Sequence, residues 1–482
     1  MPQTEPGQEA ADEHNLERFG YKQELHRGIT VLGNVALALS DITPTAAVLT
    51  TLAVILTAAG TASLISIAIA FFIAINVALC MGELGSMYPL AGGLYSIVTR
   101  VFGKPIGFLA LVDYVGQGVF IPATVIVGFG TYVNVLFPSV PVSLAAGLGM
   151  VAVTLLAMMA IRFNAWLTAV FLVLELLVVG TLAVTGFIHW NQPLSNVTNW
   201  MVADPNGHLS AVGLGALIAG ITIALYAVNG YDSAINFSEE TKGGGRQVGR
   251  AVVTALLLAI VFQFVPFVGI YFGAPSLGKL TGAVTGITDS ATAYLGPTGG
   301  TILVLGAVIA FFNATLAITL QFGRMFWASA RDRAWPDPVS PFLAKVSSRG
   351  APWTATLVIG ILSTIFAFQA SLVVLVTFTA VLIVILYATV AAASLVSRVR
   401  DKDLERPFKM PLWPVPPIIV IVGVVIALTQ QQPRDLLISL GLFVVAAIYY
   451  FAFLRTRQDR YWMPEQSAAP AGEGTGQPLG GS

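Results

Sequence analysis

Apolar runs long enough to cross a lipid bilayer recur along the whole chain of 482 residues. A membrane-spanning helix needs about 20 predominantly apolar residues. Hydrophobic residues make up 56% of the chain and charged residues only 10%, whereas a soluble domain carries about 25% charged residues. Twelve spans are predicted, with an uncertainty of one: 28–56, 63–87, 106–136, 142–161, 165–187, 214–238, 248–272, 301–324, 354–370, 372–395, 416–428 and 436–453. The chain is therefore predicted to be an all-α integral membrane protein.

Positive charges lie on one side of these spans. When the N-terminus is taken as cytoplasmic, 22 of the 24 Lys and Arg residues fall in inner segments, and the other two, Lys279 and Arg434, fall in outer segments. The positive-inside rule therefore predicts cytoplasmic termini and a place in the cell (inner) membrane. One missed or extra span would scramble this alternation, so the bias also favours twelve spans. The net charge is zero, and no nucleic-acid partner is expected.

The segments outside the spans are simple. Residues 1–27 are polar, lack a signal peptide's apolar core, and are expected to form a cytoplasmic tail. Residues 464–482 are rich in Pro, Gly, Ala and Ser and are expected to be disordered. Residues 188–213 form an outer loop and 325–353 a basic inner loop. The single cysteine, Cys80, excludes a disulfide framework, and the isolated histidines lack metal-ligand spacing, so neither a metal nor a cofactor is expected.

Two predicted spans are interrupted near their middle, and each interruption contains an aspartate. Span 28–56 is broken at Ser40-Asp41-Ile42-Thr43-Pro44-Thr45, and span 214–238 is broken at Asn229-Gly230-Tyr231-Asp232-Ser233. Proline removes a backbone donor, and unwound backbone at membrane depth persists only where protein or a wet cavity surrounds it. Paired breaks are the best sequence indication of a transporter's substrate site. The alternative is a pair of simple kinks that pack on neighbouring helices.

The two breaks lie five spans apart. Two repeats of five spans have opposite topology, which is the arrangement of an inverted-repeat transporter. We therefore predict twelve membrane helices in a five-plus-five inverted repeat in which helices 1 and 6 are broken. The first repeat covers 28–187, the second covers 214–395, and residues 396–463 hold helices 11 and 12 with their flanks.

Three stretches resemble the amino acid–polyamine–organocation superfamily of permeases. Residues 230–242, with Gly-Tyr-Asp followed by Glu-Glu-Thr, resemble its glycine–aromatic–acid break and helix end. Residues 83–95 resemble the end of its second span, and residues 324–336 resemble the loop after its eighth span. The resemblance covers nearly the whole chain. It implies the five-plus-five fold and substrate binding at the two breaks.

The first break departs from many members of this superfamily, in which a Gly-rich break holds a substrate carboxylate. Residues 40–45 contain no glycine, and their Thr-Pro, with Asp113 in span 3, is similar to bacterial putrescine importers and related polyamine permeases. Asp41, Asp113 and Asp232 would make the site richer in negative charge than a zwitterion requires. The structural alternatives are that Asp113 forms a hydrogen bond to the backbone between helices, and that Asp41 and Asp232 cap the half-helices. Substrates with a cationic amine are slightly favoured over neutral amino acids.

Glu175 stands alone among apolar residues in the middle of span 165–187. An ionised carboxylate in hydrocarbon is costly, and protonation removes its charge. We therefore predict proton coupling through Glu175. Some relatives that resemble this chain carry a lysine near this position in place of a coupling sodium ion, and an acid replaces that base here. Sodium is the alternative coupling ion, held by Thr315, Thr319 and carbonyl groups of the first break.

Further candidates lie beside the second break and at predicted cytoplasmic helix ends. Glu83 and Glu239 are expected to act as gate or loop-anchoring residues that pair with inner arginines, whereas Glu240 is expected to be solvated. Tyr231 and Phe237 lie next to the second break and are candidates for lining the site.

These features predict a secondary active transporter, a symporter or exchanger, for amino acids or related organic amines. The enzyme class considered is an intramembrane aspartyl protease, because Tyr231-Asp232 offers half of its motif, but the Gly-x-Gly-Asp half occurs nowhere in the chain. No Walker-type phosphate loop supports ATP drive. The alternatives are a polyamine importer, a sodium-coupled permease, and a channel or non-transporting sensor on a permease fold.

Overall fold

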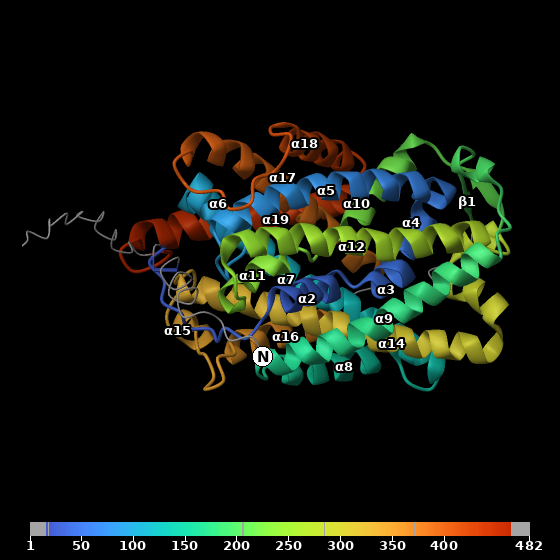
Figure 1. Ribbon diagram of the computed structural model, residues 1–482, viewed down its shortest axis with the longest axis horizontal. Helices are drawn as coiled ribbons and strands as arrows, with labels where there is room; N and C mark the ends of the chain where they lie inside the picture. Colours follow the sequence, from blue (N-terminus) through green and yellow to red (C-terminus); the bar gives the residue numbers. More distant parts are fainter. Residues whose placement is uncertain (1–15, 18, 205–206, 284, 370–371, 464–482) are drawn as a thin grey trace, which may run out of the picture.

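The computed structural model describes residues 16–17, 19–204, 207–283, 285–369 and 372–463, which form a long bundle of helices (Figure 1). The tail 464–482, most of the N-terminal tail and residue 370 of the ninth predicted span lie outside the described residues. The first half of the chain contains α2 (Val31–Ile42), α3 (Pro44–Ala46), η1 (Ala47–Thr51), α4 (Leu52–Ala59), η2 (Gly60–Ala62), α5 (Ser63–Met87), α6 (Leu94–Phe102), α7 (Lys104–Leu136), α8 (Val142–Ala157), α9 (Ile161–Ile188) and η3 (Leu194–Val197).

The second half begins after a pair of short strands. It contains α10 (Leu214–Ala227), α11 (Ser233–Asn236), η4 (Ser238–Glu240), α12 (Gly244–Gly273), α13 (Leu277–Gly282), α14 (Gly286–Arg331), α15 (Val339–Leu343), α16 (Trp353–Gln369), α17 (Leu372–Arg400), α18 (Val415–Leu428), α19 (Pro433–Tyr449), η5 (Tyr450–Leu454) and η6 (Arg455–Arg457). Helix α14 is longer than the predicted span 301–324, and it is kinked at Gly296, where φ is 69° and a proline follows.

Among the described residues, seven helical stretches are long and apolar enough to cross a membrane: Val31–Met87, Lys104–Leu136, Ile161–Ile188, Gly244–Gly273, Gly286–Arg331, Leu372–Arg400 and Pro433–Arg457. Four shorter apolar helices accompany them: Val142–Ala157, Leu214–Ala227, Trp353–Gln369 and Val415–Leu428. The prediction of a helical, multi-pass membrane protein is therefore confirmed.

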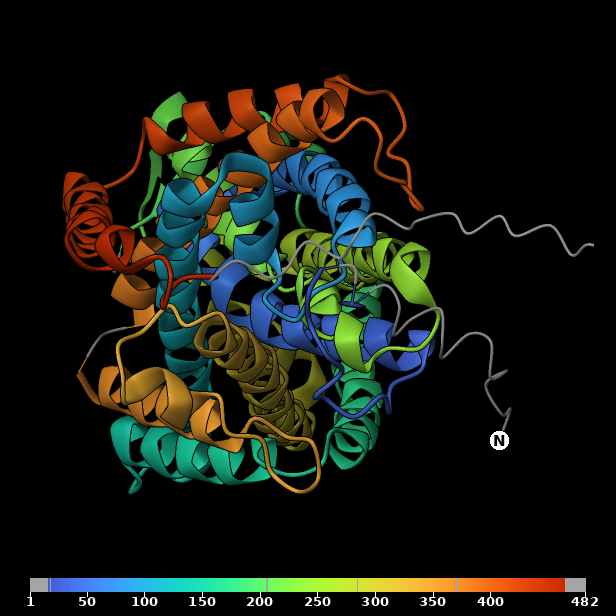
Figure 2. The same ribbon diagram turned by 90° about the vertical axis from the view of Figure 1, so that its left-hand side faces the viewer.

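A small antiparallel sheet lies in the loop 188–213, where the sequence predicted no strand. Strand β1 (Met201–Ala203) pairs with β2 (Leu209–Ala211). The amide of Met201 donates a 2.9 Å hydrogen bond to the Thr61 hydroxyl, which fixes the sheet to the end of the bundle. We call this the hairpin end. The opposite end, which carries α15 and residues 16–30, is the terminal end and faces the viewer in Figure 2.

Helix α2 lies in the middle of the bundle and contacts α9, α12 and α14 (Figures 1 and 2). Small residues allow close approach between long helices, as is common in membrane proteins. A Cβ on Gly186 of α9 would lie 2.1 Å from the Gly269 carbonyl carbon of α12. At the edge of the bundle, α19 buries few of its residues, which leaves an apolar surface for lipid. The broken helix α2–α3 is thus enclosed by protein, as unwound backbone at membrane depth requires.

Candidate functional site

The first break is a single residue, Thr43, between α2 and α3. Its φ of 49° and ψ of 76° lie in the left-handed region, which is rare for a β-branched residue. Such backbone strain, of about 1–3 kcal/mol, persists only where the surroundings fix it. The Thr43 amide donates to the Leu39 carbonyl, and Pro44 then occupies the first helical position, where its missing N–H leaves no bond unmade. The break is therefore shorter than residues 40–45.

The second break separates α10, which ends at Ala227, from α11, which begins at Ser233. Gly230 within it has a φ of 122°, a backbone conformation that residues with a side chain rarely adopt. A Cβ on Gly230 would lie 2.8 Å from the Ile42 nitrogen and 2.9 Å from the Oδ1 atom of Asp41. The structure therefore brings the two breaks into direct contact, with a glycine at the point where they meet.

A buried polar cluster holds the second break against α7 and α14. The Tyr114 hydroxyl hydrogen-bonds to the Asp232 carboxylate and lies 2.8 Å from the Asn236 amide oxygen. The Gln321 side-chain amide donates to Oδ2 of Asp232 at 2.9 Å. The Asp232 Oδ1 atom is buried and has no hydrogen-bond partner among the described residues. This carboxylate therefore keeps one free acceptor beside the break.

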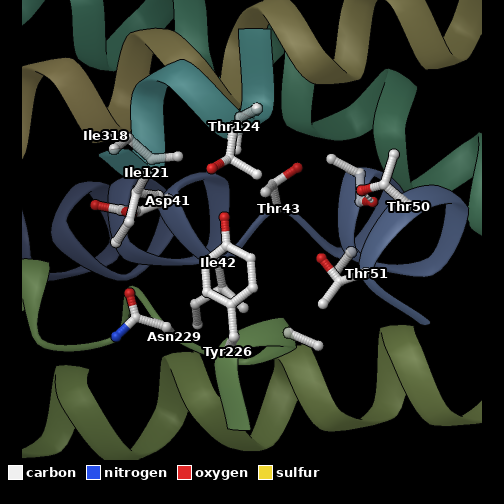
Figure 3. A pocket seen from close by; sticks show the side chains of 14 residues that line it. Asp41, Ile42, Thr43, Thr50, Thr51, Ile121, Thr124, Tyr226, Asn229 and Ile318 are labelled. Carbon is white, nitrogen blue, oxygen red and sulfur yellow. Dashed lines mark hydrogen bonds between the residues drawn. The ribbon is translucent and has the colours of Figure 1, made fainter. Parts of the chain in front are cut away.

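A cavity lies at the contact between the breaks and extends along η1 toward the hairpin end (Figure 3). The segment from α2 to η1, α7, α10, the second break and α14 contribute its walls. Figure 3 shows the Tyr226 ring beside the first break, with its hydroxyl directed toward the side of the cavity where Thr124 lies. The lining residues are Asp41, Ile42, Thr43, Ala46, Ala47, Thr50, Thr51, Ile121, Thr124, Val125, Tyr226, Ala227, Asn229 and Ile318.

The polar groups of this cavity are mainly hydrogen-bond acceptors. The hydroxyls of Thr50 and Thr124 donate to the carbonyls of Ala46 and Phe120, each at 2.7 Å, and so present their lone pairs outward. The Oδ2 atom of Asp41 is buried without a hydrogen-bond partner among the described residues. Of the described residues that line the cavity, none is basic. The cavity is therefore suited to a ligand that donates hydrogen bonds and carries positive charge.

Glu175 of α9 is buried behind the first break. Its Oε1 atom accepts a 2.7 Å hydrogen bond from the Asn313 amide of α14, and that amide also lies 3.4 Å from the Ser40 hydroxyl. The Thr45 hydroxyl donates to the Glu175 carbonyl at 2.9 Å. The Oε2 atom has no hydrogen-bond partner among the described residues. Ser40 thus lies next to Asn313 and Thr45 contacts the Glu175 backbone, and neither residue lines the cavity, while the Glu175 side chain is bonded to α14.

Asp113 does not join the polar cluster. It is buried in α7, where Gln117, one turn further along, donates a 3.4 Å hydrogen bond to it. Its neighbour Tyr114 is the residue that reaches Asp232. Adjacent residues on a helix point in directions about 100° apart, so the side chains of Asp113 and Tyr114 face different neighbours.

Four other predicted site residues, Tyr231, Ser233, Thr315 and Thr319, do not line the cavity. Tyr231 is buried, with its ring centroid 6.1 Å from that of Tyr387, and Ser233 is buried with no partner for its hydroxyl among the described residues. The hydroxyls of Thr315 and Thr319 donate to carbonyls of their own helix at 2.8 and 2.6 Å. In the described part of the chain, no group of three or more His, Cys, Asp or Glu residues is placed to hold a metal ion.

Two buried ion pairs close the terminal side of the second break. Arg331 donates two 2.9 Å hydrogen bonds to the Glu239 carboxylate. Arg324 pairs with Glu240, and both side chains are at most 1% exposed. The expectation that Glu240 is solvated is therefore wrong, because its partner lies on a different helix, α14. Phe237 lies under the Arg324 guanidinium, 5.2 Å from it, and belongs to this closed region.

Glu83 anchors the loop after α17. It pairs with Arg398 at 2.6 Å and with Arg406 at 3.1 Å, and it also accepts a hydrogen bond from the Met410 amide. Glu83 and Glu239 therefore pair with arginines at the terminal end, as the sequence suggested.

The N-terminal segment packs on the same end. Tyr21 donates a 2.7 Å hydrogen bond to Asp332, which follows α14, and Tyr95 of α6 donates to the other carboxylate oxygen at 2.9 Å. Burial and then the negative charge of Asp332 raise the pKa of Tyr21 well above its usual range, so the hydroxyl stays protonated. Gln23 donates to the Glu239 carbonyl at 2.9 Å. In the described part of the expected tail 1–27, Leu16 and Leu25 are also buried.

Sequence reasoning missed several residues of the site. Asn236, Gln321 and Asn313 are isolated amides within apolar spans, and a polar side chain at membrane depth is a signal that singles them out. Thr124 and Tyr226 carry no such signal, because both residue types are common in membrane helices. Only the packing of α7 and α10 around the first break places them in the cavity.

Comparison with known proteins adds a family match. A family model described as amino acid permease matches residues 29–454. The amino-acid permease BAT1 of Arabidopsis thaliana is 26% identical over 74% of this chain and 76% of its own length. The branched-chain amino acid permease BcaP of Lactococcus lactis is 26% identical over 83% of this chain and 89% of its own length. The serine/threonine exchanger SteT of Bacillus subtilis is 24% identical over 77% of this chain and 82% of its own length.

Proposed function

Because the chain belongs to the amino acid permease family, we propose that it moves an amino acid or a related organic amine across the cell membrane by alternating access. The chain is a transporter rather than an enzyme. One observation carries the proposal: two interrupted helices meet at Gly230 and Asp41, beside a cavity at membrane depth. Paired broken helices form substrate sites in many secondary transporters.

We propose the finer architecture on the same grounds. The 57-residue stretch Val31–Met87 is long enough for two spans, so together with the six other long stretches and the four shorter apolar helices it supports twelve spans. The two breaks, five predicted spans apart, support a five-plus-five inverted repeat. The charge bias of 22 inner against two outer Lys and Arg residues supports cytoplasmic termini and the cell membrane as the location. On this assignment, the terminal end of the bundle is the cytoplasmic end.

The substrate is proposed to bind through a protonated amine. Asp41, which lines the cavity, and Asp232, which belongs to the second break but does not line the cavity, each have one buried carboxylate oxygen without a hydrogen-bond partner among the described residues. The threonine hydroxyls of the cavity offer lone pairs, and the described lining contains no lysine or arginine to repel a cation. Buried acceptors without partners are costly, and an ammonium group would satisfy them.

An amino acid also needs a site for its carboxylate. The helical stretch 44–59 begins with Pro44, so the amides of Thr45 and Ala46 are the free donors of its first turn. Such a helix start favours an anion, and it lies at the cavity. This arrangement supports an α-amino acid, cationic or neutral, over a polyamine, which has no carboxylate.

Proton coupling through Glu175 is proposed from its contacts. The Glu175 carboxylate is bonded to Asn313 of α14, and the Glu175 backbone carbonyl accepts from Thr45 of α3, just after the first break. Its second oxygen is unpaired among the described residues, which leaves a position for a proton. Protonation would therefore alter the link between α9, α14 and the first break. Sodium remains the alternative coupling ion, because the Thr315 and Thr319 hydroxyls keep their lone pairs after donating to their own helix.

Counterflow in proteoliposomes tests the function. Purified protein is reconstituted with unlabelled amino acids or polyamines inside, and uptake of the same labelled compound is followed. Saturable, stereospecific exchange of at least one amino acid is expected. A flux that does not saturate would indicate a channel, and the absence of flux with every amino acid and amine would reject the proposal. Imposed proton and sodium gradients then identify the coupling ion.

A further inference from the structure

A surface cavity lies at the terminal end, away from the two breaks. It has a volume of about 440 Å³ and is lined by Ala330, Arg331, Arg333, Asp337, Ser340, Pro341, Ala344 and Arg460. Two candidate membrane spans end beside it, one at Arg331 and the other at Arg457. The cavity therefore lies at the terminal end of two helices that are apolar enough to cross a membrane.

Three arginines and one aspartate line this cavity. Arg331 is bound to Glu239, and Arg460 is paired with Asp337. Arg333 differs, because none of the described residues forms a hydrogen bond, ion pair or ring contact with its exposed side chain. Its backbone is nevertheless fixed: the amide donates to the Ala330 carbonyl, and the carbonyl accepts from Trp462. The backbone at Arg333 is thus fixed, while its guanidinium is exposed at the cavity without a partner among the described residues.

The backbone of Arg333 also has an uncommon conformation. Its φ is 53°, in a region that few residues other than glycine occupy. The buried Trp462 side chain, whose indole donates to the Lys104 carbonyl, anchors the segment that keeps it there. Such strained positions cluster at functional sites.

Apolar side chains are exposed beside these charges. Val339 and Phe342 of α15 flank the lining residues Ser340 and Pro341, and both side chains are about two-fifths exposed. A basic cavity bordered by exposed apolar groups matches a lipid, which has a charged headgroup and acyl chains. A soluble anion has no apolar part that could contact these exposed side chains.

We propose that this cavity binds a phosphate group, supplied by the headgroup of an anionic membrane lipid, with Arg333 as its main ligand. Arginine binds phosphate oxygens through two parallel N–H bonds. Arg460 supplies a second positive charge, which Asp337 orients. The bound lipid would stabilise the contact between the end of α14 and the segment around Trp462.

The test compares Arg333→Glu with Arg349→Glu, a matched charge change at an exposed arginine of the same loop outside the cavity. Thermal unfolding is measured in vesicles of phosphatidylcholine alone and with added phosphatidylglycerol. We expect phosphatidylglycerol to raise the Tm of the wild type and of Arg349→Glu, and Arg333→Glu to lose most of that rise. Native mass spectrometry should show fewer retained phosphatidylglycerol molecules for Arg333→Glu.

Inorganic phosphate added to the phosphatidylcholine vesicles distinguishes the source. No effect of phosphate supports the lipid, whereas an equal rise in Tm that depends on Arg333 would overturn the lipid and assign a soluble phosphate. Equal responses of the two variants to phosphatidylglycerol would overturn the site itself. Because Arg333 contacts no described side chain, its replacement is not expected to prevent folding.

Discussion

Gly230 packs against Asp41 so closely that a Cβ on the glycine would lie 2.9 Å from the Oδ1 atom of the aspartate. The two residues belong to different broken helices and are 189 positions apart in the chain, and no intervening side chain separates them. On the proposed function, a substrate bound at Asp41 would lie beside both broken helices, and we expect this contact to couple their movements.

Replacing Gly230 with alanine should prevent this contact. The new methyl group would meet the Ile42 nitrogen at 2.8 Å, and the φ of 122° would add strain of about 1–3 kcal/mol. We expect loss of transport and a lower Tm in detergent. Gly180→Ala is the control, because a Cβ there has nothing within 4 Å. Normal transport by Gly230→Ala would contradict the proposed packing of the breaks.

Asp41→Asn should discriminate between substrates. The change keeps the shape of the side chain but removes its negative charge, so binding of a cationic amine should fall severely, while a neutral amino acid should lose less. Competition against labelled substrate in proteoliposomes measures both. Asp113→Asn is the comparison, since Asp113 lies with Gln117 outside the cavity. Small, equal effects on both substrates would remove Asp41 from the binding site.

Glu175→Gln mimics a permanently protonated carboxyl group. The glutamine can still accept from Asn313, so we expect substrate binding and exchange to persist. Accumulation driven by an inward proton gradient should be lost, because the side chain no longer releases a proton. Glu405→Gln, at an exposed loop position, controls for the loss of one acid. Normal accumulation by Glu175→Gln, or a wild type that needs sodium and ignores pH, would make Glu175 a structural residue.

Tyr21→Phe should loosen the terminal end. The change removes a 2.7 Å hydrogen bond to Asp332, and a bond to a charged group contributes about 1.5–3 kcal/mol. We expect faster hydrogen exchange in residues 19–28 and easier opening of this end. Tyr88→Phe removes a comparable 2.9 Å bond to Asp401 on the same face and serves as the control. Identical exchange in both variants would show that Tyr21 does not secure the segment.

The local sequence accounts for much of the observed structure. Apolar runs predicted the membrane helices, and α5 coincides with its predicted span 63–87. Thr-Pro and Asn-Gly marked both breaks, because proline and glycine act on the backbone at their own positions. Glu83 and Glu239 were recognised as partners of arginines, since acids at basic helix ends rarely stay unpaired. Glu240 was misjudged, because nothing near it in the chain indicates that Arg324 covers it.

The membrane helices, the two interruptions and the polar residues within them thus follow from the amino-acid sequence alone, since hydrophobicity and backbone chemistry act locally. Which of those residues meet depends on how the helices pack. Packing placed Tyr114, and not Asp113, against Asp232, Ser40 against Asn313, Thr45 against the Glu175 carbonyl, and Gly230 against Asp41. Membrane helices are apolar on most faces, so their sequences carry little information about rotation, and only contact between helices fixes it.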